Sequence, residues 1–173
     1  MTTRCCVRPR VASGVRFLYD VPCRVALAAK ERRSLSALME IGVEFRSDRF
    51  PPVEGEDDEV NPGRHGKLLA QFIRRGLSER GIEADEPIAE DWGWCVPVKN
   101  EQFRLWVGCG NYEEYPDGFL CFIEPQKPVI RKWFKKIDTT QRLSAVRSAL
   151  DDLLNAEGIR EKKWWDLADG PGR

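Results

Sequence analysis

The chain has 173 residues, of which 42% are hydrophobic and six are tryptophan. This composition excludes an intrinsically disordered polypeptide and allows one folded domain with a sizeable core. No run of residues approaches the ~20 apolar residues of a membrane span, so we expect no membrane partner.

The formal net charge is zero, but the charges are unevenly distributed. Residues 1–38 contain eight basic and two acidic residues, whereas residues 39–173 contain 20 basic and 26 acidic residues. The first segment has no sustained period of 2 or 3.6, and its apolar run at residues 25–29 is too short for a signal peptide. We interpret it as a basic leader before the natural start at Met39; a disordered basic arm and an organellar transit peptide are the alternatives. A single domain is expected over residues 39–173.

A strand, a loop and a helix are expected next. Ile41, Val43 and Phe45 alternate with charged residues or glycine, which predicts a half-buried strand over residues 39–46. Prolines and an acidic run predict a solvated loop over residues 47–63. Apolar residues at positions 68, 69, 72, 73 and 77 recur at helical spacing, so we expect a helix that starts near Asn61 and ends at Gly81.

Three strands and a second helix follow. Residues 92–98, 103–109 and 119–124 predict strands, and their short connections imply antiparallel neighbours. Residues 129–138 predict irregular structure or a short helical turn. Residues 138–141 resemble a capping box, which opens an amphipathic helix that ends at Gly158. The order β-α-β-β-β-α predicts an α+β fold: a small two-layer sandwich of an antiparallel sheet of about four strands with two helices on one face.

Side-chain parity divides the strand residues between two faces of the sheet. Gly93 and Cys95 fall on the face away from the helices, where we expect the Trp106 ring to cover Gly93 and Gly108. The more apolar set should face the helices: Trp92, Trp94, Val96, Val98, Phe103, Leu105, Val107, Cys109, Phe119, Cys121 and Ile123.

An apolar patch remains on the face away from the helices, formed by Trp106, Leu120 and Phe122. Such a patch is not expected to stay bare in water. We expect either the C-terminal Trp164 and Trp165 or a partner to cover it, and that partner could be a second copy of the chain.

The loop between the last two predicted strands is a candidate binding site. It groups two tyrosines with three carboxylates: Tyr112, Glu113, Glu114, Tyr115 and Asp117. Tyrosine supplies rigid contact area at interfaces, and carboxylates speed the association of a basic partner. The loop therefore predicts a basic protein partner, although it can equally be a plain polar connection.

A pocket beside the EDWGWC segment is the alternative site, with Glu90, Asp91, Gly93 and Cys95 as its residues. Adjacent residues on a strand point to opposite faces, so Glu90 and Asp91 would not share one substrate. His65 is the only imidazole in the chain that could activate a thiol. Paired Cys-x-x-Cys spacing and nucleotide motifs are absent from the sequence, so we expect no metal and no cofactor.

The segment IRKWFKK, residues 130–136, mixes cations with aromatic rings as proteins that bind single-stranded nucleic acid do. Because the body around it is acidic, we instead expect a connecting segment with one aromatic ring in the core, and no nucleic-acid partner.

These observations favour a non-enzymatic binding module in the cytoplasm that recognises another protein. Inhibitors and immunity proteins of basic nuclease-like toxins offer an analogy of shape and charge. The alternatives are a small enzyme that uses a carboxylate or the Cys95 thiol, and a homodimer built on the Trp106 face. Without a secretory signal, we expect the thiols to be free in a reducing compartment.

Overall fold

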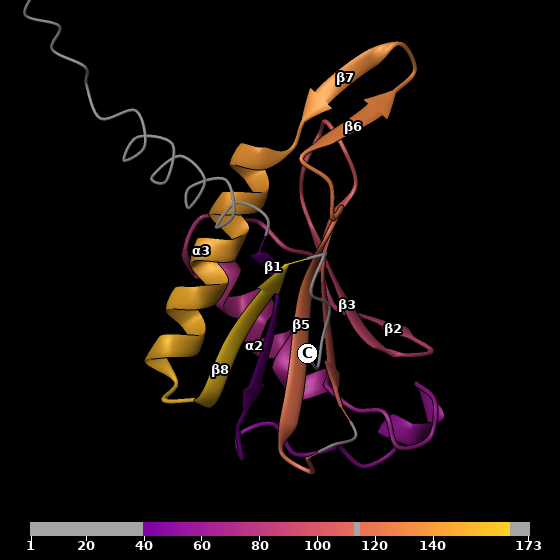
Figure 1. Cartoon of the computed structure of the whole chain (residues 1–173). Coiled ribbons are helices and arrows are strands. Elements are labelled where there is room, and N and C mark those ends of the chain that lie inside the picture. Colours follow the sequence, from indigo (N-terminus) through magenta and orange to yellow (C-terminus); the bar gives the residue numbers. More distant parts are fainter. Residues whose placement is uncertain (1–39, 113–114, 167–173) are drawn as a thin grey trace, which may run out of the picture.

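The computed structural model describes residues 40–112 and 115–166, and its main element is a six-stranded antiparallel sheet (Figure 1). The strands of this sheet follow the order β2-β3-β4-β5-β1-β8, and β6 and β7 form a separate hairpin. The strands are β1 (Glu40–Arg46), β2 (Ile88–Glu90), β3 (Gly93–Val98), β4 (Leu105–Asn111), β5 (Gly118–Glu124), β6 (Val129–Lys132), β7 (Lys135–Asp138) and β8 (Arg160–Asp166).

Two α-helices, α2 (Lys67–Glu79) and α3 (Thr140–Ala156), pack against one face of the sheet and against each other (Figure 1). We call this face the helix face and the opposite one the open face. The prediction of an α+β fold with two helices and an antiparallel sheet is confirmed, but the sheet has six strands rather than about four. Neither helix in the described part of the chain has the length and apolar character needed to cross a membrane.

The additional strands lie where the sequence pattern is weak. β2 has only three residues, and β8 carries Trp164 and Trp165 at the opposite edge of the sheet. The expectation of irregular structure over residues 129–138 is wrong, because these residues form the β6–β7 hairpin. Its two-residue loop has Trp133 at a φ of 58°, where glycine or asparagine is the usual signal, so the sequence gives no hairpin pattern.

The parity prediction is correct for β4 and β5. Leu105, Val107 and Cys109 of β4 are buried in the core, as are Phe119, Cys121 and Ile123 of β5. On β3 the prediction holds for Trp94, Val96 and Val98. It is wrong for Trp92, which precedes the strand in a turn and packs against Trp106 and Phe122.

Aromatic rings lie over glycines in one row across the open face. Register aligns Gly108 of β4, Phe122 of β5, Gly42 of β1 and Trp165 of β8. A Cβ atom on Gly108 would lie 2.4 Å from the Phe122 ring, and one on Gly42 would lie 2.0 Å from the Trp165 ring. Each ring therefore occupies the space that its glycine neighbour leaves free.

The expected packing of the Trp106 ring over Gly93 is wrong. Gly93 has a φ of 144°, and a Cβ atom there would lie 2.6 Å from the carbonyl oxygen of Cys109. Glycine is required at this position by backbone conformation and by close backbone approach. The ring over Gly108 is that of Phe122 and not that of Trp106.

A buried carboxylate, Glu56, fixes the start of α2. Glu56 lies in a single 3-10 turn (Glu56–Asp58) within the loop that the sequence predicts to be solvated, and it is only 2% exposed. Its Oε1 accepts hydrogen bonds from the N–H groups of Gly66 (2.8 Å) and Lys67 (2.7 Å) and from Nε1 of Trp94 (2.8 Å). Its Oε2 accepts one from the N–H of Val53 (2.9 Å).

This arrangement explains why the helix begins at Lys67 and not near Asn61 as predicted. The first N–H groups of a helix need acceptors, and a negative charge at that end is favourable. Glu56 supplies both from ten residues upstream, so no local capping residue is needed. The predicted end of the helix is confirmed: Gly81 has a φ of 74°, and the N–H of Ile82 donates to the carbonyl of Leu77 at 3.0 Å.

Replacing Glu56 with glutamine should lower the free energy of unfolding by about 2–3 kcal/mol at neutral pH. The NH₂ group of the amide would face N–H groups whose hydrogen bonds the carboxylate now accepts. Burial raises the pKa of Glu56, but the hydrogen bonds outweigh it and hold the pKa below its ordinary 4.5. The carboxylate therefore stabilises the fold fully above that value and ceases to do so as the pH falls through the folded-state pKa. Urea unfolding at neutral and acidic pH should show the difference between wild type and variant shrinking below about pH 4.

Asp58→Asn is the matched control, because Asp58 is exposed in the same turn. This variant should differ from wild type by less than about 0.5 kcal/mol. Equal losses in both variants, or a Glu56→Gln effect that does not depend on pH, would contradict the capping role.

Candidate functional site

In the predicted binding loop, the two tyrosines pack against each other and against neighbouring residues of the same fold. The rings of Tyr112 and Tyr115 meet edge to face at 6.0 Å, and the guanidinium of Arg46 lies 4.5 Å from the Tyr115 ring centre. Tyr112 also covers Gly118, where a Cβ atom would lie 2.9 Å from the ring. Glu113 and Glu114 lie outside the described residues.

The third carboxylate of this loop, Asp117, is neutralised by two arginines. Its Oδ1 lies 2.9 Å from Arg46, and its Oδ2 lies 2.6 Å from Arg160. The hydrogen bond from Arg46 is the main reason that the pKa of Asp117 lies below its ordinary value. Asp117 therefore joins three strand ends and adds little negative field for a partner.

The three thiols within the described residues do not have the properties of nucleophiles. Cys95, Cys109 and Cys121 are all free and buried. Burial, together with the nearby Glu90 carboxylate, raises the pKa of Cys95 to about 11, and burial raises that of Cys109 well above its ordinary value. Cys95 lies on the open face, whereas His65 packs edge to face on the buried Phe119 of the helix face at 5.6 Å. The sheet therefore separates the imidazole from this thiol.

The remaining residues of the alternative pocket do not converge either. Glu90 ends the edge strand β2 opposite Gly93, and Asp91 is exposed in the turn that follows. Among residues 40–112 and 115–166, no three His, Cys, Asp or Glu side chains are grouped so that they could hold a metal ion.

The open face carries a cluster of three aromatic rings and one leucine that we call the aromatic patch: Trp92, Trp106, Leu120 and Phe122. The centres of the Trp92 and Trp106 rings are 5.8 Å apart, and Phe122 lies 5.2 Å from the first and 5.4 Å from the second. All four side chains are partly exposed, and Trp92 is 37% exposed. Sequence parity identified three of these residues but not Trp92, because a turn residue has no strand parity.

Trp164 and Trp165 do not form the predicted cover for the patch. Trp164 points to the helix face, where its Nε1 donates to Asp151 of α3 at 2.8 Å. Trp165 is on the open face but lies over Gly42 of β1, and β5 and β1 separate β8 from the Trp106 strand.

Carboxylates surround the aromatic patch. Glu124 is opposite Trp106, Glu44 is opposite Leu120, and Glu90 and Asp91 directly precede Trp92 in sequence. None of these four carboxylates is in an ion pair within the described residues. Two cations lie near these carboxylates. Lys163 is opposite Glu44 on the neighbouring strand, and Arg104 is close enough to Cys95 to act on that thiol. The rim therefore has more negative than positive groups.

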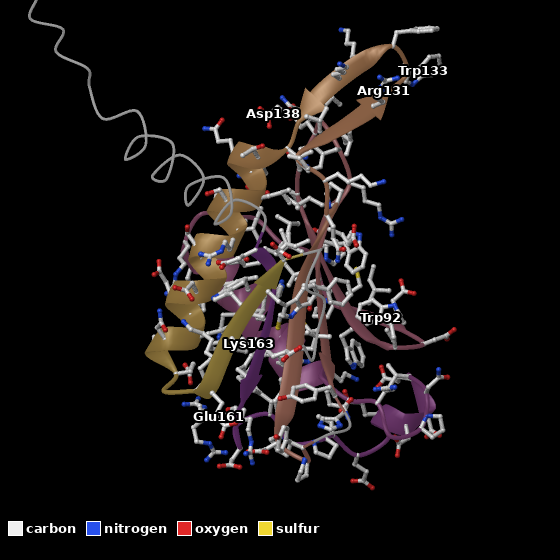
Figure 2. All side chains as sticks on the ribbon, viewed as in Figure 1. Trp92, Arg131, Trp133, Asp138, Glu161 and Lys163 are labelled. Carbon is white, nitrogen blue, oxygen red and sulfur yellow. The ribbon has the colours of Figure 1, made fainter. Side chains whose placement is uncertain are left out.

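The β6–β7 hairpin is a second exposed aromatic element, which we call the arm. It projects beyond the end of the main sheet (Figure 1), and Figure 2 shows Trp133 at its tip. Trp133 is 89% exposed and Phe134 is 102% exposed. The prediction that this segment places one aromatic ring in the core is therefore wrong; its partly buried residues are Ile130 and Ile137 at the base.

Four cations stand directly behind the tip of the arm: Arg131, Lys132, Lys135 and Lys136. All four are exposed, and none pairs with a carboxylate in the part of the chain that the structure describes. Trp133 also occupies a left-handed backbone conformation that costs a non-glycine residue free energy. The tip of the arm thus combines a strained backbone at Trp133 with exposed aromatic surface, and both features are typical of binding elements.

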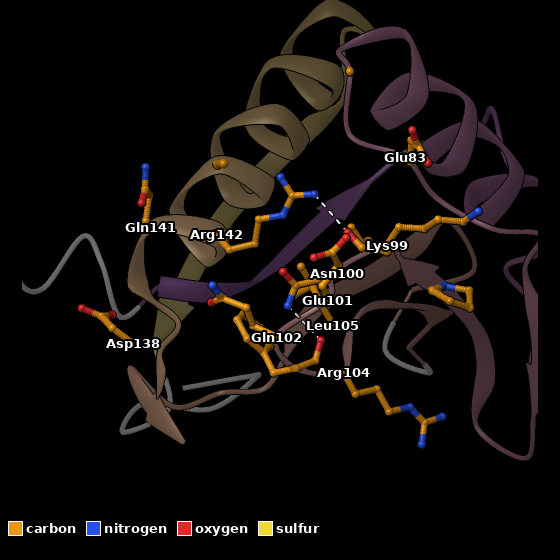
Figure 3. Close-up of a pocket in the computed structure, with 15 residues that line it drawn as sticks. Glu83, Lys99, Asn100, Glu101, Gln102, Arg104, Leu105, Asp138, Gln141 and Arg142 are labelled. Atoms are coloured by element: carbon orange, nitrogen blue, oxygen red, sulfur yellow. Dashed lines mark hydrogen bonds between the residues drawn. The ribbon is translucent and has the colours of Figure 1, made fainter. Parts of the chain in front are cut away.

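A cavity of about 1070 Å³ lies beside the base of the arm (Figure 3). Its charged lining is balanced, with Lys99, Arg104 and Arg142 against Glu83, Glu101 and Asp138. Arg142 donates to the carbonyl of Lys99 at 3.1 Å, so part of this polar lining is already used within the protein. The cavity offers neither a field of one sign nor grouped catalytic side chains.

Comparisons of the chain with models of protein families, with curated proteins and with solved structures found no match.

Native Cys95 should react slowly with iodoacetamide. A pKa of about 11 instead of 9.0 lowers the thiolate fraction at pH 7 about 100-fold. Labelling followed by peptide mass spectrometry should show Cys95, Cys109 and Cys121 reacting at least about 100-fold more slowly in native than in urea-unfolded protein. Fast native labelling at any of the three would contradict this account and restore the thiol-enzyme hypothesis.

Proposed function

We propose that this protein is a non-enzymatic binding module that recognises a basic protein segment through the aromatic patch. The observation that carries the proposal is the exposure of Trp92, Trp106 and Phe122 together on the face that no described helix covers. Contiguous exposed aromatic surface with a polar rim is typical of protein interaction sites.

The sign of the partner's charge follows from the rim. Four carboxylates that form no ion pair within the described residues surround an apolar centre, where they attract cations and repel anions, and such rim charges act mainly on the association rate. The rings would supply the buried anchors, since tryptophan is the residue type most enriched among binding hot spots. Arginine is a suitable counterpart, because its guanidinium pairs with carboxylates and stacks on aromatic rings.

The patch supports this function better than the loop that carries Tyr112 and Tyr115. In that loop Asp117 is neutralised by Arg46 and Arg160, and Tyr112 packs on Gly118. An enzymatic function has less support, because the Cys95 thiol is buried with a raised pKa and, among the described residues, Glu90 and Asp91 belong to no group of three side chains that could hold a metal ion.

A short synthetic peptide that alternates arginine and phenylalanine tests the proposal. Titration into the protein should change the tryptophan fluorescence, since the peptide itself contains no tryptophan. Glu90→Lys/Asp91→Lys should weaken binding about tenfold through lost attraction, and Trp106→Ala should weaken it by a similar factor through lost contact area.

Glu79→Lys/Asp152→Lys is the matched control, because it makes the same charge change at exposed positions of α2 and α3. The control should bind the peptide as wild type does, and a peptide of alternating glutamate and phenylalanine should not bind. Equal weakening in the patch and control variants would show only a general charge effect and would contradict a site on the open face.

A further inference from the structure

We propose that the basic segment recognised by the aromatic patch is the arm of a second copy of this chain. This inference rests on the proposed function of the patch and names its occupant. Apart from Tyr115, whose ring packs on Arg46, the exposed aromatic residues of the described structure lie in the patch and the arm, and these two elements have opposite charges.

The arm has the chemistry that the patch requires. Its strands pair Arg131 with Lys136 and Lys132 with Lys135, so each face of the hairpin presents two cations next to the tip. Trp133 and Phe134 lie ahead of these cations. An aromatic tip could pack on Trp92 and Trp106 while the cations behind it reach the carboxylates of the rim.

Neither element has an ion-pair partner among the described residues, although Lys132 of the arm donates to the carbonyl of Gln102 at 3.4 Å. The four cations of the arm and the four carboxylates of the rim are absent from the ion pairs of the described residues. Figure 2 shows Trp133 and Trp92 well apart, so the arm does not lie on its own patch. A second copy of the chain would supply an arm for the patch and a patch for the arm. A symmetric dimer would contain this arm–patch contact twice.

The other anionic partners of a basic arm are less well supported. Single-stranded nucleic acid is bound along a continuous basic track, whereas the cavity beside the base of the arm has balanced charges. An anionic membrane surface would accept the arm but would leave the aromatic patch bare. Only a copy of the chain uses both elements.

Sedimentation velocity of the full-length protein over a range of concentrations tests this arrangement. Wild type should form a dimer that dissociates as salt is added, because charge pairs at the rim are screened. Lys135→Glu/Lys136→Glu and Glu90→Lys/Asp91→Lys should each raise the dimer dissociation constant by about 100-fold, since each reversal affects two symmetric contacts.

A mixture of the two reversed variants gives the sharpest result. Each double reversal cancels the net charge of one element, so neither variant alone has an attractive contact, whereas a mixed pair keeps one wild-type contact between the unmodified arm and the unmodified patch. The mixture should therefore form a dimer while either variant alone stays monomeric. Glu79→Lys/Asp152→Lys should dimerise like wild type, which controls for net charge.

The inference is overturned if wild type is monomeric at every concentration, or if the mixture of reversed variants stays monomeric. The same holds if the arm binds phosphatidylserine vesicles or an oligothymidylate while the protein remains monomeric. Titrating Trp133→Ser/Phe134→Ser with the arginine–phenylalanine peptide separates the two proposals. Peptide binding without dimerisation would leave the patch as a site for another basic protein, and loss of both would remove the proposed function as well.

Discussion

The carboxylate of Glu56 holds together parts of the chain that have little other reason to meet. It accepts N–H groups from the loop before it, from the start of α2 and from the indole of Trp94 in β3. The Lys67 ammonium lies 4.9 Å from the centre of the Trp94 ring and pairs with Glu59, so a second charge strengthens the same junction. A buried ion with four donors is strongly favoured over one with a missing partner.

This junction also positions the aromatic patch. The loop that Glu56 anchors continues to Asn61, whose N–H donates to the carbonyl of Asp91 at 3.3 Å. Asp91 immediately precedes Trp92, so the turn that carries Trp92 is tied to the anchored loop. Across the sheet, Gly108 and Gly42 leave room for the rings of Phe122 and Trp165 to lie flat on their neighbours. The position of Trp92 on the open face thus depends on a cap on the opposite side of the sheet.

The sequence was informative where one periodicity applied to a whole element. The alternation in β1, β4 and β5 and the apolar stripes of both helices predicted the correct core residues, because burial on one face imposes those periods. The capping role of Glu56 was not predictable, since the helix N–H groups that it accepts are ten and eleven residues away and an acidic run usually marks a solvated loop. The arm was missed because its turn carries Trp133 and Phe134 instead of the usual turn residues. The candidate site was predicted in part. Side-chain parity identified Trp106, Leu120 and Phe122, but the position of Trp92 and the carboxylates of the rim could be placed only from the strand pairing in the structure.

In the dimer that we propose, the aromatic patch of one chain and the arm of the other bury each other. Hydroxyl-radical footprinting of the individual tryptophans at low and high protein concentration tests it most directly. Trp133, now 89% exposed, and Trp92, 37% exposed, should become protected together as the concentration rises, while Trp94, at 3%, stays unchanged as an internal reference. Protection of Trp133 without Trp92, or no change in either residue, would contradict the account.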